Sequence, residues 1–311
     1  MDELRPGVLR VTFALPLGID HVHCYLLRSG DGSWTLVDTG LGVEDPESAW
    51  RPVLDVLDGP VERIVVTHLH PDHVGGSADV AALTGARVHQ GRLDYEQCLG
   101  AWGDESTPAR SAAHLAANGM PAELVERVRA ESVWLRGRVR FVRDPVLLDP
   151  GDRVDGWEVL HLPGHADGHI ALVKDGVLIA GDTILGRITP TVGLYQQSRP
   201  DPLADYLESL GRIASLGATV AFAGHEEPVA DPELRVRELE AHHEERMGAA
   251  LHALAGEPRS AYVVSLDLFP SELPSGQRRF ALAETLAHLE RLVAEGRARR
   301  DEEDGVALYR R

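Results

Sequence analysis

The sequence predicts an α+β protein in two parts, a layered domain over residues 1–230 and a smaller domain over residues 231–311. Short apolar runs with strand periodicity alternate with helical segments in the first part, which indicates sheets covered by helices. A stretch rich in Ala, Arg and Glu at about 91–144 interrupts this alternation as a helical insertion. The second part begins with a long helical pattern and ends in a short pair of strands.

The first 90 residues alternate between strands and helices. The run Arg63–Val66 is apolar and β-branched, as expected for a buried strand. Ser29–Gly32 lies between two strand-like runs and is predicted to form a hairpin turn. We expect strands at 8–13, 22–27, 33–38, 63–66 and 87–89, and helices at 46–57 and 78–83.

The insertion is predicted to contain helices at about 111–118 and 121–135. An insertion of this length beside the polar turn described below suits a cap that shapes a substrate pocket. A peripheral bundle or a dimer face fits the pattern equally well. Candidate pocket or interface residues are Trp102, Met120 and Trp134, although core packing is the better interpretation of each taken singly.

Strand patterns return after the insertion. We expect strands at 139–142, 157–162, 170–173, 177–180 and 220–225, with an amphipathic helix at 202–216. In the second part we expect helices at 232–254 and 279–295, and a hairpin from 298–301 to 306–309. Helices followed by a small hairpin resemble a winged helix, so we expect a winged-helix-like C-terminal domain.

The turn Thr67–His73 carries most of the chemistry. It places His68, His70, Asp72 and His73 directly after a buried strand and before a helix start. In such a turn His68 and His70 project the same way, while Asp72 and His73 reach a second point close by. Imidazole and carboxylate are the usual ligands of zinc and related metals. The spacing therefore predicts a metal site rather than a loop of chance histidines.

Other polar residues end other strands. Asp38, His165, Asp182 and His225 each lie at or just after the end of an apolar run. Layered folds assemble their sites at strand ends on one edge, so we expect these residues near the turn. Asp38 is placed to accept a proton from a ligating imidazole, with a simple turn aspartate as the alternative. Asp182 is either a helix cap or a ligand.

Composition limits the partners and the compartment. The 311-residue chain has 31 basic and 49 acidic residues, and its formal charge of −18 repels phosphate backbones and attracts divalent cations. No apolar run approaches the roughly 18 residues of a membrane span, and no signal peptide is expected. The two cysteines, Cys24 and Cys98, predict no disulfide framework, so we expect a cytoplasmic protein.

Together these blocks resemble the metallo-β-lactamase superfamily. The matching residues are Asp38-Thr39-Gly40, His68-Leu69-His70-Pro71-Asp72-His73, Pro163-Gly164-His165, Gly181-Asp182 and Gly224-His225. The resemblance implies an αββα sandwich, in which two sheets lie face to face with helices outside and a dinuclear metal site along one edge. It also implies one metal held by His68, His70 and His165, a second held by Asp72, His73 and His225, and a bridging Asp182.

Details of the resemblance narrow the activity. Asp72 as a ligand suggests the hydrolase branch that includes glyoxalase II-type thioesterases, lactonases and nucleases. The best-known β-lactamases carry Cys at the bridging position, where this chain has Asp182, so antibiotic hydrolysis is a poor expectation. The tail resembles that of a lactamase-β-like hydrolase branch which includes a mitochondrial nuclease. Glu226 stands where relatives often carry Gly, and a carboxylate beside the site would disfavour anionic substrates.

We therefore expect a hydrolase that uses a metal-bridged hydroxide on a small-molecule acyl substrate, namely a thioester, an ester or a lactone. Two divalent metal ions are expected, with zinc as the default and iron or manganese also suited to these ligands. Asp72 is a candidate proton acceptor for the bridging water. Tyr195, downstream of Asp182, is a candidate hydrogen-bond donor to the substrate or leaving group, with a core tyrosine as the alternative.

Two other functions stay open at this point. One is a phosphodiesterase or ribonuclease, but residues 240–311 contain 10 Arg and no Lys against 13 Asp and Glu. Binding to a nucleic acid backbone needs clustered positive charge, so nucleic acid is not the expected partner. The other is a non-catalytic, metal-bound winged-helix scaffold, against which the complete ligand set argues. An apolar face on the tail would favour a homodimer.

Overall fold

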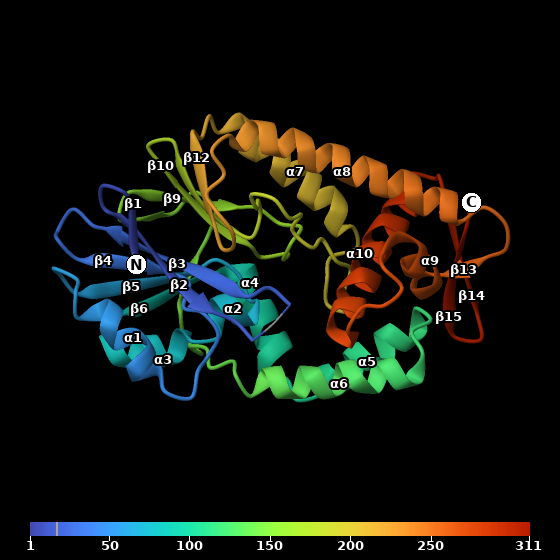
Figure 1. Ribbon diagram of the computed structural model, residues 1–311, viewed down its shortest axis with the longest axis horizontal. Helices are drawn as coiled ribbons and strands as arrows, with labels where there is room; N and C mark the ends of the chain where they lie inside the picture. The colour runs from blue at the N-terminus through green and yellow to red at the C-terminus, as the bar shows by residue number, and fades with distance from the viewer. Residues whose placement is uncertain (17) are drawn as a thin grey trace.

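The computed structural model describes residues 1–16 and 18–311 and contains two β-sheets packed face to face between outer helices (Figure 1). Helices α1 (Pro46–Leu54) and α3 (Ser77–Thr84) lie on one side of the pair of sheets, and α7 (Pro202–Ser215) lies on the other. The predicted αββα sandwich is therefore confirmed.

The first sheet has the strand order β1-β2-β3-β4-β5-β6-β7. Strands β1 to β4 pair antiparallel with their neighbours, whereas β4 to β7 run parallel. The strands are β1 (Asp2–Arg5), β2 (Val8–Ala14), β3 (His21–Arg28), β4 (Trp34–Val37), β5 (Val61–Val66), β6 (Arg87–Gly91) and β7 (Val146–Leu148). Because β4 and β5 are parallel, the residues that follow them meet at one edge of the sheet.

The second sheet has the order β12-β11-β10-β9-β8, with β11 and β12 parallel and the other pairs antiparallel. Its strands are β8 (Arg153–Val154), β9 (Trp157–His161), β10 (Ile170–Lys174), β11 (Val177–Gly181) and β12 (Val220–Ala223). The parallel pairing of β11 and β12 again brings the residues after both strands to a common edge.

The sequence of β5 shows why the sheets stack. Val65 points into the core between the two sheets, where Leu172 and Ile179 of the second sheet also lie. Ile64 and Val66 point the other way, into the core beneath the helices α1 and α3. A strand buried on both faces needs apolar residues at every position, which is the pattern of this run.

Two backbone hydrogen bonds join the sheets at the edge where the polar residues gather. The N–H of Ile170 donates to the carbonyl of Thr67 at 2.9 Å, and the N–H of His23 donates to the carbonyl of Gly224 at 2.7 Å. These bonds fix the turn Thr67–His73 and the end of β12 in place, each against the other sheet.

The insertion is helical, as predicted. It contains α4 (Arg92–Cys98), a π-helical turn (Leu99–Gly103), α5 (Thr107–Ala117) and α6 (Ala122–Arg136). The strand expected at 139–142 is wrong. Arg140 instead docks on the start of α3, because its N–H donates to Gly75 and its carbonyl accepts from Ala78. The last strand of the first sheet is β7, a few residues later.

The C-terminal part contains α8 (Pro232–Ala253), β13 (Arg259–Ser260), α9 (Ala261–Leu268), α10 (Ser275–Ala294), β14 (Arg299–Glu303) and β15 (Val306–Arg310). The predicted final hairpin is confirmed, and β13 joins it in a sheet of order β13-β15-β14. Residues of α8 and α10 share one apolar core with α7 and with β11 and β12. None of the described helices is long and apolar enough to cross a membrane.

Candidate metal centre

The turn after β5 owes its shape to a proline. His70 is extended, with ψ 147°, and Pro71 then occupies the first turn of the short helix α2 (Pro71–Val74). Proline suits this position because its fixed φ is already helical and the missing N–H has no helical partner to lose. The helix turns Asp72 and His73 back toward the ends of the neighbouring strands.

His68, His70 and His165 form one group of converging nitrogens. His70 Nδ1 lies 3.0 Å from His68 Nε2 and 2.9 Å from His165 Nε2. Burial, followed by the neighbouring imidazoles, holds the pKa of His68 and of His70 well below the usual value. Neutral imidazoles that point at a common centre are the form in which histidine binds a metal.

Asp72, His73 and His225 form a second group. His225 Nε2 lies 3.4 Å from Asp72 Oδ2, and His73 Nε2 lies 3.9 Å from the same oxygen. The structure therefore brings together the residues of each predicted ligand set.

Asp182 lies between the two groups. Its carboxylate oxygens are 3.7 Å from His165 Nε2, 3.4 Å from His73 Nε2 and 3.1 Å from His225 Nε2. Burial alone would raise the pKa of Asp182, but His225 and His73 hold it well below the usual value, so the carboxylate is ionised. The helix-cap alternative is wrong, because the next helix, α7, begins only at Pro202.

The outward nitrogen of four of these rings has a fixed partner. The pairs are His68 Nδ1 with Thr67 Oγ1 at 3.0 Å, His73 Nδ1 with Asp38 Oδ2 at 2.8 Å, His165 Nδ1 with the Thr191 carbonyl at 2.9 Å and His225 Nδ1 with the His21 carbonyl at 2.7 Å. Partners of this kind fix the tautomer and orientation of a ligating imidazole.

The geometry predicted for Asp38 is confirmed. Besides His73 Nδ1, its carboxylate accepts the N–H and the hydroxyl of Thr67, each at 2.8 Å. Asp38 adopts a left-handed backbone, with φ 61°, which among non-glycine residues Asp and Asn tolerate best. One buried side chain thus ties the end of β4 to the metal-site turn.

The donor set fits divalent metal ions. His73 Nε2 and Asp182 Oδ1 are buried, yet neither has a hydrogen-bond partner among the residues that the structure describes. Such atoms are costly unless something binds them, and a cation would satisfy both. Gly224 leaves the space they need, because a Cβ there would lie 2.3 Å from Asp182 Oδ1 and 2.6 Å from His73 Cε1.

Two residues beside the centre have no counterpart in the sequence-based prediction. His169 is fully buried, stacks on His68 with ring centroids 4.7 Å apart, and accepts the N–H of Asp182 at 3.1 Å. Asp94 is also fully buried and accepts the N–H of Leu69 at 2.8 Å. A second Gly-His pair, three residues after His165, is a signal for His169. Asp94 has no such signal, because it comes from the insertion.

Tyr195 is placed differently from the seven predicted ligands. No hydrogen bond joins it to any of them in the described part of the chain, and its ring folds back over Gly193. The charged groups that act on it are Arg279 and Glu284 of α10. Burial raises the pKa of Tyr195 to about 12, so its hydroxyl keeps its proton near neutral pH. Its role as a donor stays a prediction.

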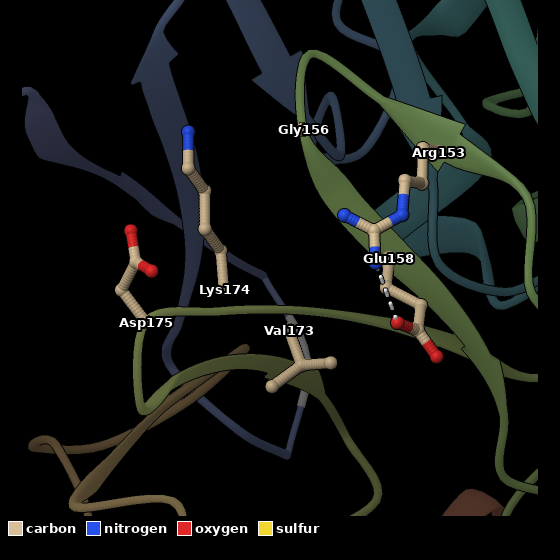
Figure 2. A pocket seen from close by; sticks show the side chains of 6 residues that line it. All are labelled: Arg153, Gly156, Glu158, Val173, Lys174 and Asp175. Carbon is tan, nitrogen blue, oxygen red and sulfur yellow. Dashed lines mark hydrogen bonds and ion pairs between the residues drawn. The ribbon is translucent and has the colours of Figure 1, made fainter.

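A separate hollow of about 420 Å³ lies beside the β10–β11 turn of the second sheet (Figure 2). It is lined by Arg153, Gly156, Glu158, Val173, Lys174 and Asp175. Arg153 pairs with Glu158 at 3.2 Å, as the dashed line in Figure 2 shows. The hollow surrounds the β10–β11 turn, whereas Asp182 follows the other end of β11, so it is not part of the metal centre.

Comparison with known proteins agrees with this geometry. The family model described as the metallo-beta-lactamase superfamily matches residues 17–225. The chain belongs to the metallo-β-lactamase superfamily. A second model, described as a metallo-beta-lactamase-like C-terminal domain, matches residues 247–311. The chain is therefore an enzyme of this hydrolase superfamily, whose members bind divalent metal ions.

Similar proteins are known from several bacteria. A metallo-β-lactamase family protein from Thermus thermophilus is 39% identical, with a TM-score of 0.87 over 99% of this chain and 100% of that one. A probable metallo-hydrolase of Bacillus subtilis is 27% identical over 305 residues, 93% of this chain and 92% of that protein. A hydroxyacylglutathione hydrolase of Aeromonas hydrophila is 32% identical over 193 residues, 59% of this chain and 56% of that protein.

Proposed function

We propose that this superfamily member is a dinuclear metal-dependent hydrolase of acyl substrates, which are thioesters, esters or lactones. The observation that carries the proposal is Asp182, an ionised carboxylate within 3.7 Å of a nitrogen from each of the two ligand groups. His68, His70 and His165 would hold one ion and Asp72, His73 and His225 the other, with Asp182 between them.

Two divalent ions held there would supply the Lewis acidity that lowers the pKa of a shared water toward ~7 and polarises a carbonyl oxygen. The protein's part is to hold the ligating imidazoles in a fixed tautomer and orientation, through Asp38 and the other outward partners. Zinc is our first expectation, and iron and manganese also suit His and Asp ligands.

We assign two residues to proton handling. Asp72 has one carboxylate oxygen near both His73 and His225 and is 9% exposed, so it can take up the proton of the attacking water and return it to solvent. Tyr195 keeps its hydroxyl proton and is our candidate donor to the substrate or leaving group. A Tyr195→Phe variant with unchanged kcat and KM would remove it from this role.

The acyl assignment is supported by a relative and by charge. The Aeromonas hydrophila relative is named for hydrolysis of an acylglutathione, which is a thioester. The formal charge of −18 disfavours a polyanionic polymer, so we expect a small molecule rather than nucleic acid as substrate. Both cysteines are free and buried, which supports our proposal of a cytoplasmic location.

A substrate panel tests the proposal. Metal-replete protein should hydrolyse at least one of acyl-CoA, acylglutathione and acyl-homoserine lactone substrates. A chelator or the Asp182→Ala substitution should lower kcat/KM at least 10³-fold, whereas His252→Asn, at an exposed position on α8, should leave it nearly unchanged. Elemental analysis should find two metal ions per chain. Turnover of none of the panel, or equal turnover in Asp182→Ala, would contradict the proposal.

We further propose that the C-terminal part supports a homodimer. Val263 on α9 and Phe280 on α10 are 38% and 40% exposed, so the C-terminal part leaves these two apolar side chains at its surface. Multi-angle light scattering of the full chain should give twice the chain mass, and Phe280→Glu should shift the mass toward that of one chain. A wild-type mass of one chain would exclude the dimer.

A further inference from the structure

The loop between β11 and α7 connects Asp182 to a hydrogen-bond partner of His165. We call residues 183–194 the strap. It begins directly after Asp182, and its Thr191 carbonyl accepts the outward nitrogen of His165 at 2.9 Å. At its far end the N–H of Leu194 donates to the carbonyl of Ala283, inside α10, at 2.9 Å. A movement of the strap would therefore displace Asp182 and the hydrogen-bond partner of His165.

Glu226 holds the middle of the strap from one side. Its carboxylate accepts the backbone N–H groups of Arg187 at 2.6 Å and Ile188 at 3.1 Å. The side chain is 10% exposed and is therefore occupied by the strap. From the sequence we expected this carboxylate to lie beside the site and to disfavour anionic substrates. In the structure it binds the backbone of the strap instead. Glu226 has a left-handed backbone, with φ 65°, which is uncommon for this residue type.

Arg235 of α8 holds the same segment from the other side. Its guanidinium donates to the carbonyls of Leu185 at 2.8 Å, Arg187 at 3.1 Å and Ile188 at 2.9 Å. The side chain is 12% exposed, so these bonds are partly shielded from water. The Arg235 guanidinium thus donates to three backbone carbonyls of the strap, which has no helix or strand of its own to satisfy them.

We propose that Glu226 and Arg235 are positioning residues, which clamp the strap so that Asp182 and the Thr191 partner of His165 keep their places in the metal centre. The clamp engages both the backbone donors and the backbone acceptors of residues 187 and 188, and Arg187 Nε also lies 3.7 Å from Glu226 Oε1. The Arg187 side chain is 83% exposed and Ile188 is 45% exposed. The inference rests on the proposed metal-dependent function, because it assigns a task within that centre.

Hydrogen–deuterium exchange of the metal-loaded full chain tests the clamp. The amides of Arg187 and Ile188 donate to Glu226, so Glu226→Ala should speed exchange of the peptide covering residues 185–191 at least tenfold. Arg235→Met should have a similar effect. Glu226→Gln keeps an acceptor oxygen and should restore most of the protection. Matched controls are Glu227→Ala and Arg237→Gln, whose ion pairs with Arg10 and Glu233 lie outside the strap.

A spectroscopic readout separates positioning from simple loss of local order. In cobalt-substituted protein, Glu226→Ala and Arg235→Met should shift the visible d–d bands, because the His165 geometry changes, while Glu226→Gln and both controls should match the wild type. Unchanged exchange or unchanged bands in both loss variants would overturn the clamp. Absence of turnover on every acyl substrate would instead reject the proposed function, and would leave the exchange result as it stands.

Discussion

Carboxylates lie on both sides of the His73 ring and determine its charge. Asp38 accepts from Nδ1, while Asp182 and Asp72 face Nε2. Burial lowers the pKa of His73, but these three carboxylates outweigh it and the pKa is raised well above its usual value. A ring in this field attracts either a proton or a metal, and metal binding must displace the proton.

The outer partner of His73 should govern metal affinity. Asp38→Asn keeps a side chain that tolerates the left-handed backbone but removes the charge that orients the ring. We expect metal affinity, measured by competition with a chromophoric chelator, to fall about 10- to 100-fold. Asp175→Asn is the matched control, because Asp175 is also left-handed, with φ 48°, but lies in the β10–β11 turn. Equal affinity in the wild type and Asp38→Asn would contradict this assignment.

Asp94 should matter through the backbone between two ligands. Asp94→Ala leaves the N–H of Leu69 without its carboxylate partner, at a cost of about 1–3 kcal/mol. We expect lower stability in urea together with weaker metal binding, because Leu69 separates His68 from His70. Asp94→Asn keeps an acceptor oxygen and should recover most of both. If Asp94→Ala bound metal as tightly as the wild type, the residue would be structural only.

Among the elements, those defined by apolar periodicity were predictable and those defined by tertiary contacts were not. The strands at 170–173 and 177–180 and the helix at 121–135 form as expected, because local pattern and burial agree there. The run 139–142 looks like a strand, but Arg140 finds its backbone partners at Gly75 and Ala78 instead. No local pattern indicates a partner so distant in the sequence.

The residues in and around the metal centre also fall into a predictable and an unpredictable set. The residues that gather there stand at strand ends and form recognisable blocks, so the site could be predicted. Asp94 and Arg235 could not, because each comes from a helix whose placement depends on packing. The clamping role of Glu226 was hidden for a related reason, since only the fold brings Arg187 and Ile188 to its carboxylate.

Helix α10 contains a buried carboxyl that should make stability depend on pH. Burial raises the pKa of Glu284 to about 7, against an ordinary value of 4.5. Between these pH values the folded state keeps a proton that the unfolded state has lost. The wild type should therefore lose stability relative to Glu284→Gln as pH rises from about 4.5 through 7, by roughly 3 kcal/mol at most.

Urea unfolding of both proteins at pH 5 and pH 8 checks this sign. An exposed substitution on α8, Glu244→Gln, provides the control and should show no comparable change between the two pH values. A gain in wild-type stability relative to Glu284→Gln at pH 8 would contradict the prediction.

On the scale of the whole molecule, one apolar core extends from the second sheet into the C-terminal part. Leu178 of β11, Leu203 of α7, Leu239 of α8 and Leu286 of α10 all belong to it. The strap and Arg235 add polar contacts across the same boundary. The two matched regions, 17–225 and 247–311, are therefore packed together rather than joined by a free linker.

Metal binding should stabilise this whole assembly. An ion that binds only the folded state raises the free energy of unfolding, by about 2.7 kcal/mol when its free concentration is 100 times Kd. Calorimetry should show a higher Tm with zinc than after chelation, and Asp182→Ala should lose most of the difference. An equal zinc-dependent shift in Asp182→Ala would place the stabilising ion elsewhere.

The parallel pairings of β4 with β5 and of β11 with β12 have a consequence for how such a protein changes over evolution. Each ligand-bearing segment is anchored by the strand before it, so the connections on the far side of the helices can lengthen or shorten without moving the cations. A long insertion such as 91–144 can then change along its outer helices, provided that a carboxylate at the position of Asp94 still holds the N–H of Leu69.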